Sequence, residues 1–235
     1  MCRLTLLASG HLVGFRLEYC DADSLRNLYQ EIFAREEYFF ECNTRTPVIF
    51  DCGANIGLAT VFFKWLYPES TVIAFEADPT TFAILQRNID LNGLVNVSAH
   101  NVALWDNNDI IPFFVIDNQP GSLLMSTNAN RTHGREIKVD ARRLSEYVTT
   151  PVDLLKLDVE GAERRVICDL LQSGKMSLVR RMILEYHHHI PGDAAGLGSF
   201  LTLLEQSGWN YQLHSNFFPP AEKDVFQDVM IYAYR

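Results

Sequence analysis

The sequence has little of what marks nucleic-acid-binding and membrane proteins. Lysine and arginine never occur in runs longer than two, and the 235 residues carry a formal net charge of -9. A nucleic-acid-binding protein ordinarily carries a basic patch that neutralises phosphates, and the sequence has no such cluster. Its uninterrupted apolar runs fall well short of the roughly 20 residues that cross a bilayer. We therefore expect neither a nucleic-acid partner nor a membrane span.

Signals for disulfides and for secretion are also missing. The five cysteines include no Cys-x-x-Cys pair, and an odd number of them fits reduced thiols better than a disulfide framework. The apolar run at residues 4–8 is shorter than the core of a signal peptide. These features predict a cytoplasmic protein.

The composition is that of an ordinary globular protein, 48% hydrophobic and 21% charged. A chain of this length suits one compact domain, which we place at residues 47–235 after an appendage at residues 1–46. Within the appendage, two β-like runs around a turn predict a hairpin. Leu25, Leu28 and Ile32 then recur at helical spacing and predict a short helix.

From Pro47 onward, short apolar strands alternate with amphipathic helices. This alternation is typical of an α/β fold with a mostly parallel sheet and helices on both faces. Residues 109–140 interrupt the rhythm with two strand-like runs and predict an inserted β-ribbon. The strands are expected at residues 48–50, 72–75, 97–102, 154–157 and 182–184, with closing strands at 209–213 and 229–234.

A glycine-rich turn at residues 51–57 follows the first strand. Such a turn can be purely structural, because a tight reversal needs residues that tolerate positive φ. Two carboxylates favour a ligand site, since Asp51 ends the first strand and Glu76 ends the second, where a carboxylate can accept hydrogen bonds from ribose hydroxyls. A dinucleotide-binding turn would need glycine in place of Asn55 and Leu58. The pattern predicts an adenosine ligand without phosphates.

Several motifs in register resemble the FkbM family of S-adenosylmethionine-dependent methyltransferases, and the resemblance extends over about residues 30–190. It implies the class I methyltransferase Rossmann-like fold, with a seven-stranded sheet whose last strand is antiparallel. It also implies methylation of a hydroxyl on a small molecule, sugar or natural product. The motifs are Asp51-Cys52-Gly53-Ala54-Asn55-Ile56-Gly57, Phe75-Glu76-Ala77-Asp78-Pro79, Asn88 with Leu91-Asn92, Ala103-Leu104-Trp105-Asp106 and Leu155-Lys156-Leu157-Asp158-Val159-Glu160-Gly161-Ala162-Glu163.

The resemblance also implies roles for individual residues. The methionine end of the cofactor would contact Asp51, Gly53, Asn55 and Gly57. The ribose would be held by Glu76, and the adenine would be bordered by Ala77, Asn101, Val102 and Ala103. Residues 30–33 and Tyr38 resemble the family's segment that covers the cofactor. Cys52 departs from the family's usual aliphatic residue, which we interpret as a substitution within the core.

The methyl acceptor is expected at the carboxyl ends of the fourth and fifth strands. Asp158, Glu160 and His187 are the candidate catalytic residues, with His187 in the family's Glu-x-His register as the candidate base. Three structural alternatives stand beside these roles: Asp158 as a helix N-cap, Glu160 as an acid near a helix N-terminus, and solvated loop histidines. Asp158 and Glu185 could also hold a divalent metal ion.

Two other functions share parts of this pattern. A nicotinamide-dependent oxidoreductase would have the same strand, turn and acidic residue, although Asn55 and Leu58 argue against it. A domain that binds S-adenosylmethionine without turnover is the other alternative. Residues 109–140 and 190–198 are expected to shape the acceptor pocket, because binding loops carry specificity. The identity of the acceptor and the oligomeric state stay open at the level of the sequence.

Overall fold

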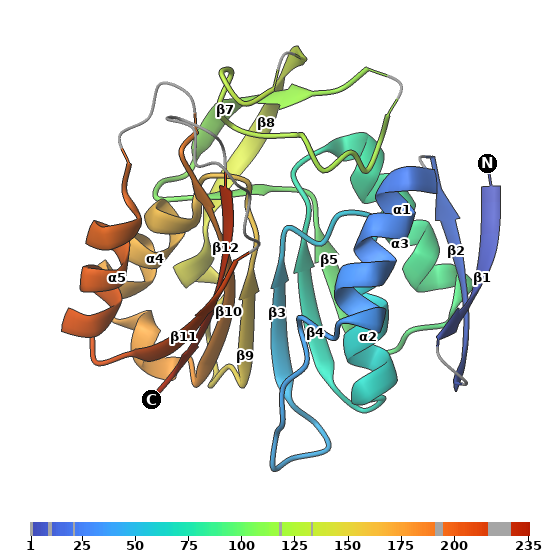
Figure 1. Ribbon diagram of the computed structural model, residues 1–235, viewed down its shortest axis with the longest axis horizontal. Coiled ribbons are helices and arrows are strands. Elements are labelled where there is room, and N and C mark those ends of the chain that lie inside the picture. The colour runs from blue at the N-terminus through green and yellow to red at the C-terminus, as the bar shows by residue number, and fades with distance from the viewer. Residues whose placement is uncertain are drawn as a thin grey trace.

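The computed structural model describes residues 2–8, 11–20, 22–117, 119–132, 134–190, 195–215 and 227–235. A central sheet runs through the molecule with helices on both sides (Figure 1). Along this sheet the strands lie in the order β11 (Asn210–His214), β12 (Gln227–Tyr234), β10 (Arg181–His188), β9 (Leu154–Leu157), β3 (Val48–Cys52), β4 (Thr71–Phe75) and β5 (Val97–His100).

Strand direction changes only at β12 within this sheet. The pairings from β10 through β9, β3 and β4 to β5 are all parallel, whereas β12 is antiparallel to both β10 and β11. Because parallel neighbours need a crossover, helices connect them and cover the two faces. The predicted α/β class with a mostly parallel sheet is confirmed.

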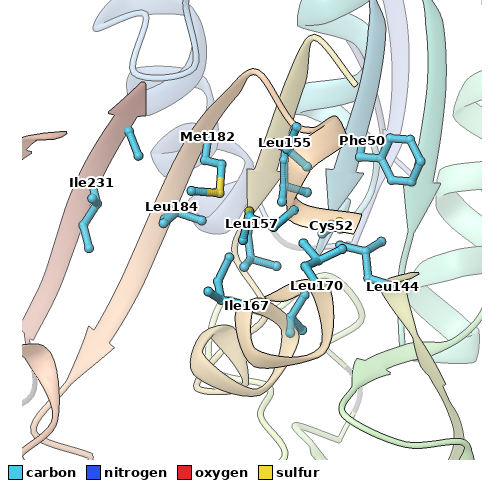
Figure 2. Close-up of a cluster of buried hydrophobic side chains, with 14 of the residues drawn as sticks. Phe50, Cys52, Leu144, Leu155, Leu157, Ile167, Leu170, Met182, Leu184 and Ile231 are labelled. Atoms are coloured by element: carbon cyan, nitrogen blue, oxygen red, sulfur yellow. The ribbon is translucent and has the colours of Figure 1, made fainter. Parts of the chain in front are cut away.

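The two faces of the sheet bury alternate residues of the same strands. Phe50, Leu155 and Leu184 pack on one face, together with α4 (Glu163–Gln172) and α5 (Leu197–Gln206). Figure 2 shows this cluster, in which Ile167 and Leu170 of α4 face the strand residues. Their neighbours Ile49, Leu154 and Ile183 pack on the opposite face. Successive strand residues point to opposite sides, so a strand buried on both faces must be apolar throughout.

The opposite face is covered by α2 (Leu58–Leu66) and by the N-terminal segment. That segment contains β1 (Cys2–Ala8), β2 (His11–Tyr19) and α1 (Ala22–Tyr29), and α1 continues into a π-helical turn, Gln30–Ala34. Ile32 and Phe33 of this turn pack into the same core as α2. The helical segment therefore runs from Ala22 to Ala34, beyond both ends of the spacing from Leu25 to Ile32 that predicted it.

Asn88 of α3 (Pro79–Leu91) fixes the hairpin to the domain. Its side chain accepts a hydrogen bond from the Glu18 N–H at 2.7 Å and donates to the Glu18 carbonyl at 3.0 Å and the Ile56 carbonyl at 2.8 Å. The amide thus satisfies three backbone groups of two segments, β2 and the turn before α2, that would otherwise be buried without partners.

Residues 103–143 form a second sheet. β6 (Ala103–Trp105), β8 (Arg135–Arg143) and β7 (Asp109–Val115) pair in that order, with β7 and β8 antiparallel. The expected third strand at residues 97–102 is wrong at its end, because β5 stops at His100 and the chain then enters the second sheet. Short helical turns at Leu144–Glu146 and Lys175–Leu178 complete the described elements. Within the described residues, every helix is too short or too polar to cross a membrane.

Candidate functional site

A cavity opens where β3, β4 and β9 end, and we call it the central cavity. The space between its atoms comes to about 850 Å³, including space open to solvent at its mouth. The loops after the three strands supply Gly53, Ala54, Asn55, Glu76, Ala77, Asp158, Val159 and Glu160. Two segments outside the main sheet cover it, contributing Leu28, Ile32 and Tyr38 on one side and Ser122, Leu123, Met125 and Thr127 on the other.

The turn after β3 needs glycine at position 53. Gly53 has φ of 80°, and a Cβ added there would collide with the carbonyl oxygen of Asp158. Only a residue without a side chain lets the loops after β3 and β9 approach this closely. Asn55 also adopts a left-handed conformation, with φ of 50°, which asparagine tolerates better than most residues.

Glu76 connects the turns after β3 and β4. One carboxylate oxygen accepts from the Asn55 N–H at 2.9 Å, and the other accepts from the Asp78 N–H at 2.9 Å. Burial raises the pKa of Glu76 to about 7, although these two hydrogen bonds favour the ionised form. A carboxylate offers about four acceptor positions, so Glu76 retains capacity for hydroxyl donors in the cavity.

The structure divides the residues expected at the cofactor into two groups. Six of them line the central cavity, namely Gly53, Asn55, Glu76, Ala77, Val102 and Ala103. The other three do not line it. Asp51 is fully buried and accepts a hydrogen bond from Thr60 at 2.6 Å. Gly57 precedes α2 and leaves no room for a Cβ against Leu85.

Asn101 is the third residue that is absent from the cavity wall. Its side-chain amide donates to the carbonyl of Glu76 at 2.8 Å and to that of Ala77 at 3.1 Å. These bonds hold the backbone of the loop after β4. Asn101 therefore supports two residues that line the central cavity, and its expected place beside the adenine stays a prediction.

Lys156 also lines the central cavity, and the sequence prediction gave it no role. Its ammonium donates to the Gly53 carbonyl at 2.7 Å and to Asp158 at 3.3 Å, and it lies 3.5 Å from an oxygen of Asp51. Burial alone would lower the pKa of Lys156, but the two carboxylates outweigh burial and raise it. The available signal was a lysine inside the apolar strand 154–157, since a buried lysine almost always has a partner.

Asp158 and Glu160 stand on the cavity wall, and neither takes its structural alternative. The N-cap of α4 is Ala162, and the acid in the first turn is Glu163. Glu160 has φ of 55° and pairs with Arg131, whose side chain is 8% exposed. A non-glycine residue in this conformation costs free energy and is common at functional sites.

His187 lies within β10 and is buried, so the alternative of a solvated loop histidine is wrong for it. Its Nδ1 lies 2.8 Å from Glu163, and its Nε2 lies 2.9 Å from Glu160. Burial lowers the pKa of His187, but the Glu163 carboxylate reverses this and the net shift is upward. His187 does not itself line the central cavity but contacts it through Glu160.

Glu185 is two residues before His187 on the same strand. Its carboxylate accepts a hydrogen bond from the Tyr38 hydroxyl at 3.4 Å. Burial and the nearby Asp158 raise the pKa of Glu185 to about 8. Asp158, Glu185 and His187 each place one potential metal-ligand atom within 4.8 Å of the others.

Comparison with known proteins identifies the family. The model of the methyltransferase FkbM domain matches residues 51–213. The chain belongs to the FkbM methyltransferase family. This FkbM-family protein is 30% identical over 220 residues to Methyltransferase 1 of Beauveria bassiana (strain ARSEF 2860), covering 85% of this chain and 86% of that one. It is 28% identical over 229 residues to the 31-O-demethyl-FK506 methyltransferase FkbM of Streptomyces tacrolimicus, covering 83% and 86%.

Solved structures show the same fold. A methyltransferase FkbM from Methylobacillus flagellatus KT superimposes with a TM-score of 0.56 at 16% identity over 88% of this chain, which spans 48% of that larger one. The precorrin-6y C5,15-methyltransferase of Geobacter metallireducens GS-15 gives 0.52 at 12% identity, covering 88% and 89%. The predicted FkbM family is confirmed, and the protein is a methyltransferase with a class I fold.

Proposed function

We propose that this FkbM-family protein uses S-adenosylmethionine as methyl donor and binds it in the central cavity. The observation that carries the proposal is Glu76, a cavity-lining carboxylate held by two backbone amides beside the turn at Gly53. A carboxylate at this position can accept hydrogen bonds from both hydroxyls of a ribose. Phe75, Val102 and Leu104 give the cavity an apolar wall for a purine.

Two further carboxylates of the cavity suit the sulfonium. Asp158 and Glu160 line it, and carboxylates close to a cation lower its energy most where water is excluded. When bound, the donor supplies a methyl group for in-line displacement, with S-adenosylhomocysteine as the other product. The protein contributes orientation, because collinear placement of the reacting atoms lowers the barrier by several kcal/mol.

We propose that the acceptor is a hydroxyl of a small molecule and that this hydroxyl donates to Asp158 or Glu160. Support comes from the Streptomyces tacrolimicus relative, whose name describes an O-methyltransferase. Nε2 of His187 lies 2.9 Å from the Glu160 carboxylate, so we propose that His187 acts through Glu160 and not as the direct base. Leu28, Leu123 and the other apolar lining residues suit an acceptor with an apolar framework.

We also propose the domain division at residues 46 and 47, since the family match begins at residue 51. A cytoplasmic location is part of the proposal as well. It is supported by the free thiols of Cys20, Cys42, Cys52 and Cys168.

Titration calorimetry with S-adenosylhomocysteine tests the cofactor site. Glu76→Ala should weaken binding by roughly 10- to 100-fold, because hydrogen bonds to a charged group contribute about 1.5–3 kcal/mol. Glu69→Ala removes an exposed glutamate of the same domain and should leave affinity unchanged. Equal affinities in the two variants, or stabilisation by NAD(H) but not by S-adenosylhomocysteine, would contradict the proposal.

Labelled methyl transfer tests the reaction. We expect label from S-adenosylmethionine to enter a small-molecule fraction of an extract, and fragmentation of the product to place the methyl on oxygen. A methyl on nitrogen or carbon would refute O-methylation while keeping the donor. Tight cofactor binding without any labelled product would favour a non-catalytic domain.

A further inference from the structure

We propose that Asp158, Glu185 and His187 bind a divalent metal ion at the edge of the central cavity. The sheet itself brings them together. β9 and β10 are parallel, with Leu157 opposite Leu184, so the next residue along each strand places Asp158 beside Glu185. Residues two apart on a strand share a face, which puts His187 next to Glu185.

The three ligand atoms have separations that one ion can bridge. They lie within 4.8 Å of one another. Two ligands bound to one Mg²⁺ or Ca²⁺ at about 2.0–2.6 Å lie no more than about 4–5 Å apart. Small side-chain movements therefore suffice to bring all three into coordination.

An independent observation is a buried carboxylate oxygen without a partner. Asp158 Oδ2 is held by Lys156 at 3.3 Å, whereas Oδ1 is shielded from water and has no hydrogen-bond partner among the described residues. This oxygen lies 3.9 Å from Nε2 of His187, whose side chain is only 1% exposed. A buried carboxylate oxygen without a donor is costly, and a cation between it and the imidazole would remove that cost.

The charge around His187 also favours a cation. Within the described part of the chain, two cationic side chains contact the carboxylates of this cluster, Lys156 at Asp158 and Arg131 at Glu160. The carboxylates themselves number five: Asp158, Glu160, Glu163, Glu185 and Asp228. The carboxylates therefore outnumber the cationic side chains that contact them, and a divalent ion would add compensating positive charge. Buried charges are ordinarily paired or bound to metal.

The ligand set indicates which ion to use as a probe. Two carboxylates with one imidazole suit Mn²⁺, Fe²⁺, Co²⁺ or Zn²⁺, whereas Mg²⁺ prefers sites made of oxygen ligands alone. The ion would bind at Nε2 of His187, which lies 3.9 Å from Oδ1 of Asp158 and 2.9 Å from the Glu160 carboxylate. Its role rests on the proposed function, because an ion at this edge would lower the pKa of an acceptor hydroxyl.

Mn²⁺ binding to chelator-treated protein, followed by the electron paramagnetic resonance of free Mn²⁺, tests the site. We expect one ion per chain. Asp158→Asn, Glu185→Gln and His187→Gln should each weaken binding by at least about tenfold. Asp106→Asn, which breaks a half-exposed ion pair with Arg165, is the matched control and should bind Mn²⁺ normally.

Two results would overturn the site. One is a dissociation constant above about 1 mM for Mn²⁺, Co²⁺ and Zn²⁺ alike, the weak limit of protein sites for Ca²⁺. The other is Mn²⁺ binding that survives both Glu185→Gln and His187→Gln. S-adenosylhomocysteine binding by the metal-free Glu185→Gln and His187→Gln variants shows that they are folded, and urea unfolding shows it for Asp158→Asn, because Asp158 also lines the proposed cofactor cavity. If the protein does not bind Mn²⁺ but binds S-adenosylhomocysteine, the metal site is refuted and the proposed function is not. If it binds Mn²⁺ but not S-adenosylhomocysteine, the proposed function is refuted and the metal site is not.

Discussion

Lys156→Met is expected to destabilise the protein by about 3–5 kcal/mol, the usual cost of removing one partner from a buried ion pair. The side chains of Lys156 and Asp51 are 3% and 0% exposed, so water cannot replace the lost ammonium. Methionine fills a similar volume, and the packing of β9 should survive. The cost therefore comes from the two carboxylates, Asp51 and Asp158, that lose their shared cation.

Urea unfolding of matched variants measures this cost. Lys64 is also buried, but its ammonium donates to the Ser70 carbonyl at 2.7 Å and no ion pair with a carboxylate is described for it. Lys64→Met should therefore cost only about 1–3 kcal/mol. Adding Asp51→Asn to Lys156→Met should cost less than the sum of the single changes, because the two residues interact. If Lys156→Met is no less stable than Lys64→Met, the assignment of Lys156 as the central counter-ion is wrong.

Three further predictions concern other contacts. Gly53→Ala should destabilise the protein by about 2 kcal/mol or more in the same urea assay, because position 53 has a positive φ and a Cβ there would clash with the loop after β9. Gly198→Ala, in an open helical position, is the control and should be neutral or stabilising. Because the pKa of Glu76 is about 7, its ionised fraction rises from about a tenth at pH 6 to about nine tenths at pH 8. The affinity for S-adenosylhomocysteine should rise up to about tenfold over that range and stay flat in Glu76→Gln, and a flat profile for the unchanged protein would contradict the ribose role. Asn88→Ala should cost about 2–3 kcal/mol and speed hydrogen exchange in β2, and unchanged exchange would show that the hairpin is held elsewhere.

Local patterns explain which parts of the fold were predictable. From β3 through its turn to α2, an apolar strand, a glycine-rich turn and apolar residues at helical spacing all lie within twenty residues. The predicted strand and turn accordingly match β3 and its loop. The end of β5 was predicted wrongly. Val102 and Ala103 open a new apolar run after His100 and Asn101, and pairing of this run with β8, almost forty residues away, takes the chain into the second sheet.

The candidate site was predictable where a residue's place on a strand fixes its position. Glu76 and Asp158 follow β4 and β9, and parallel strands bring such residues to one edge of a sheet. The partners of these residues were not predictable. Arg131 comes from a polar segment with no regular pattern, yet it pairs with Glu160, and Glu163 reaches His187 across 24 residues. Such contacts depend on tertiary packing, which leaves no local periodicity.

The division of the central cavity between sheet loops and covering segments has a consequence for how such a protein can change. The loops after β3, β4 and β9 pack closely against one another, as Gly53 does against Asp158, so their sequences tolerate little variation. The covering residues, among them Leu28 and Leu123, belong to segments outside the main sheet. Grafting the segment that contains Leu123 from a relative should therefore exchange the accepted substrate while the donor site stays intact. New acceptors can be selected in this scaffold without rebuilding its sheet.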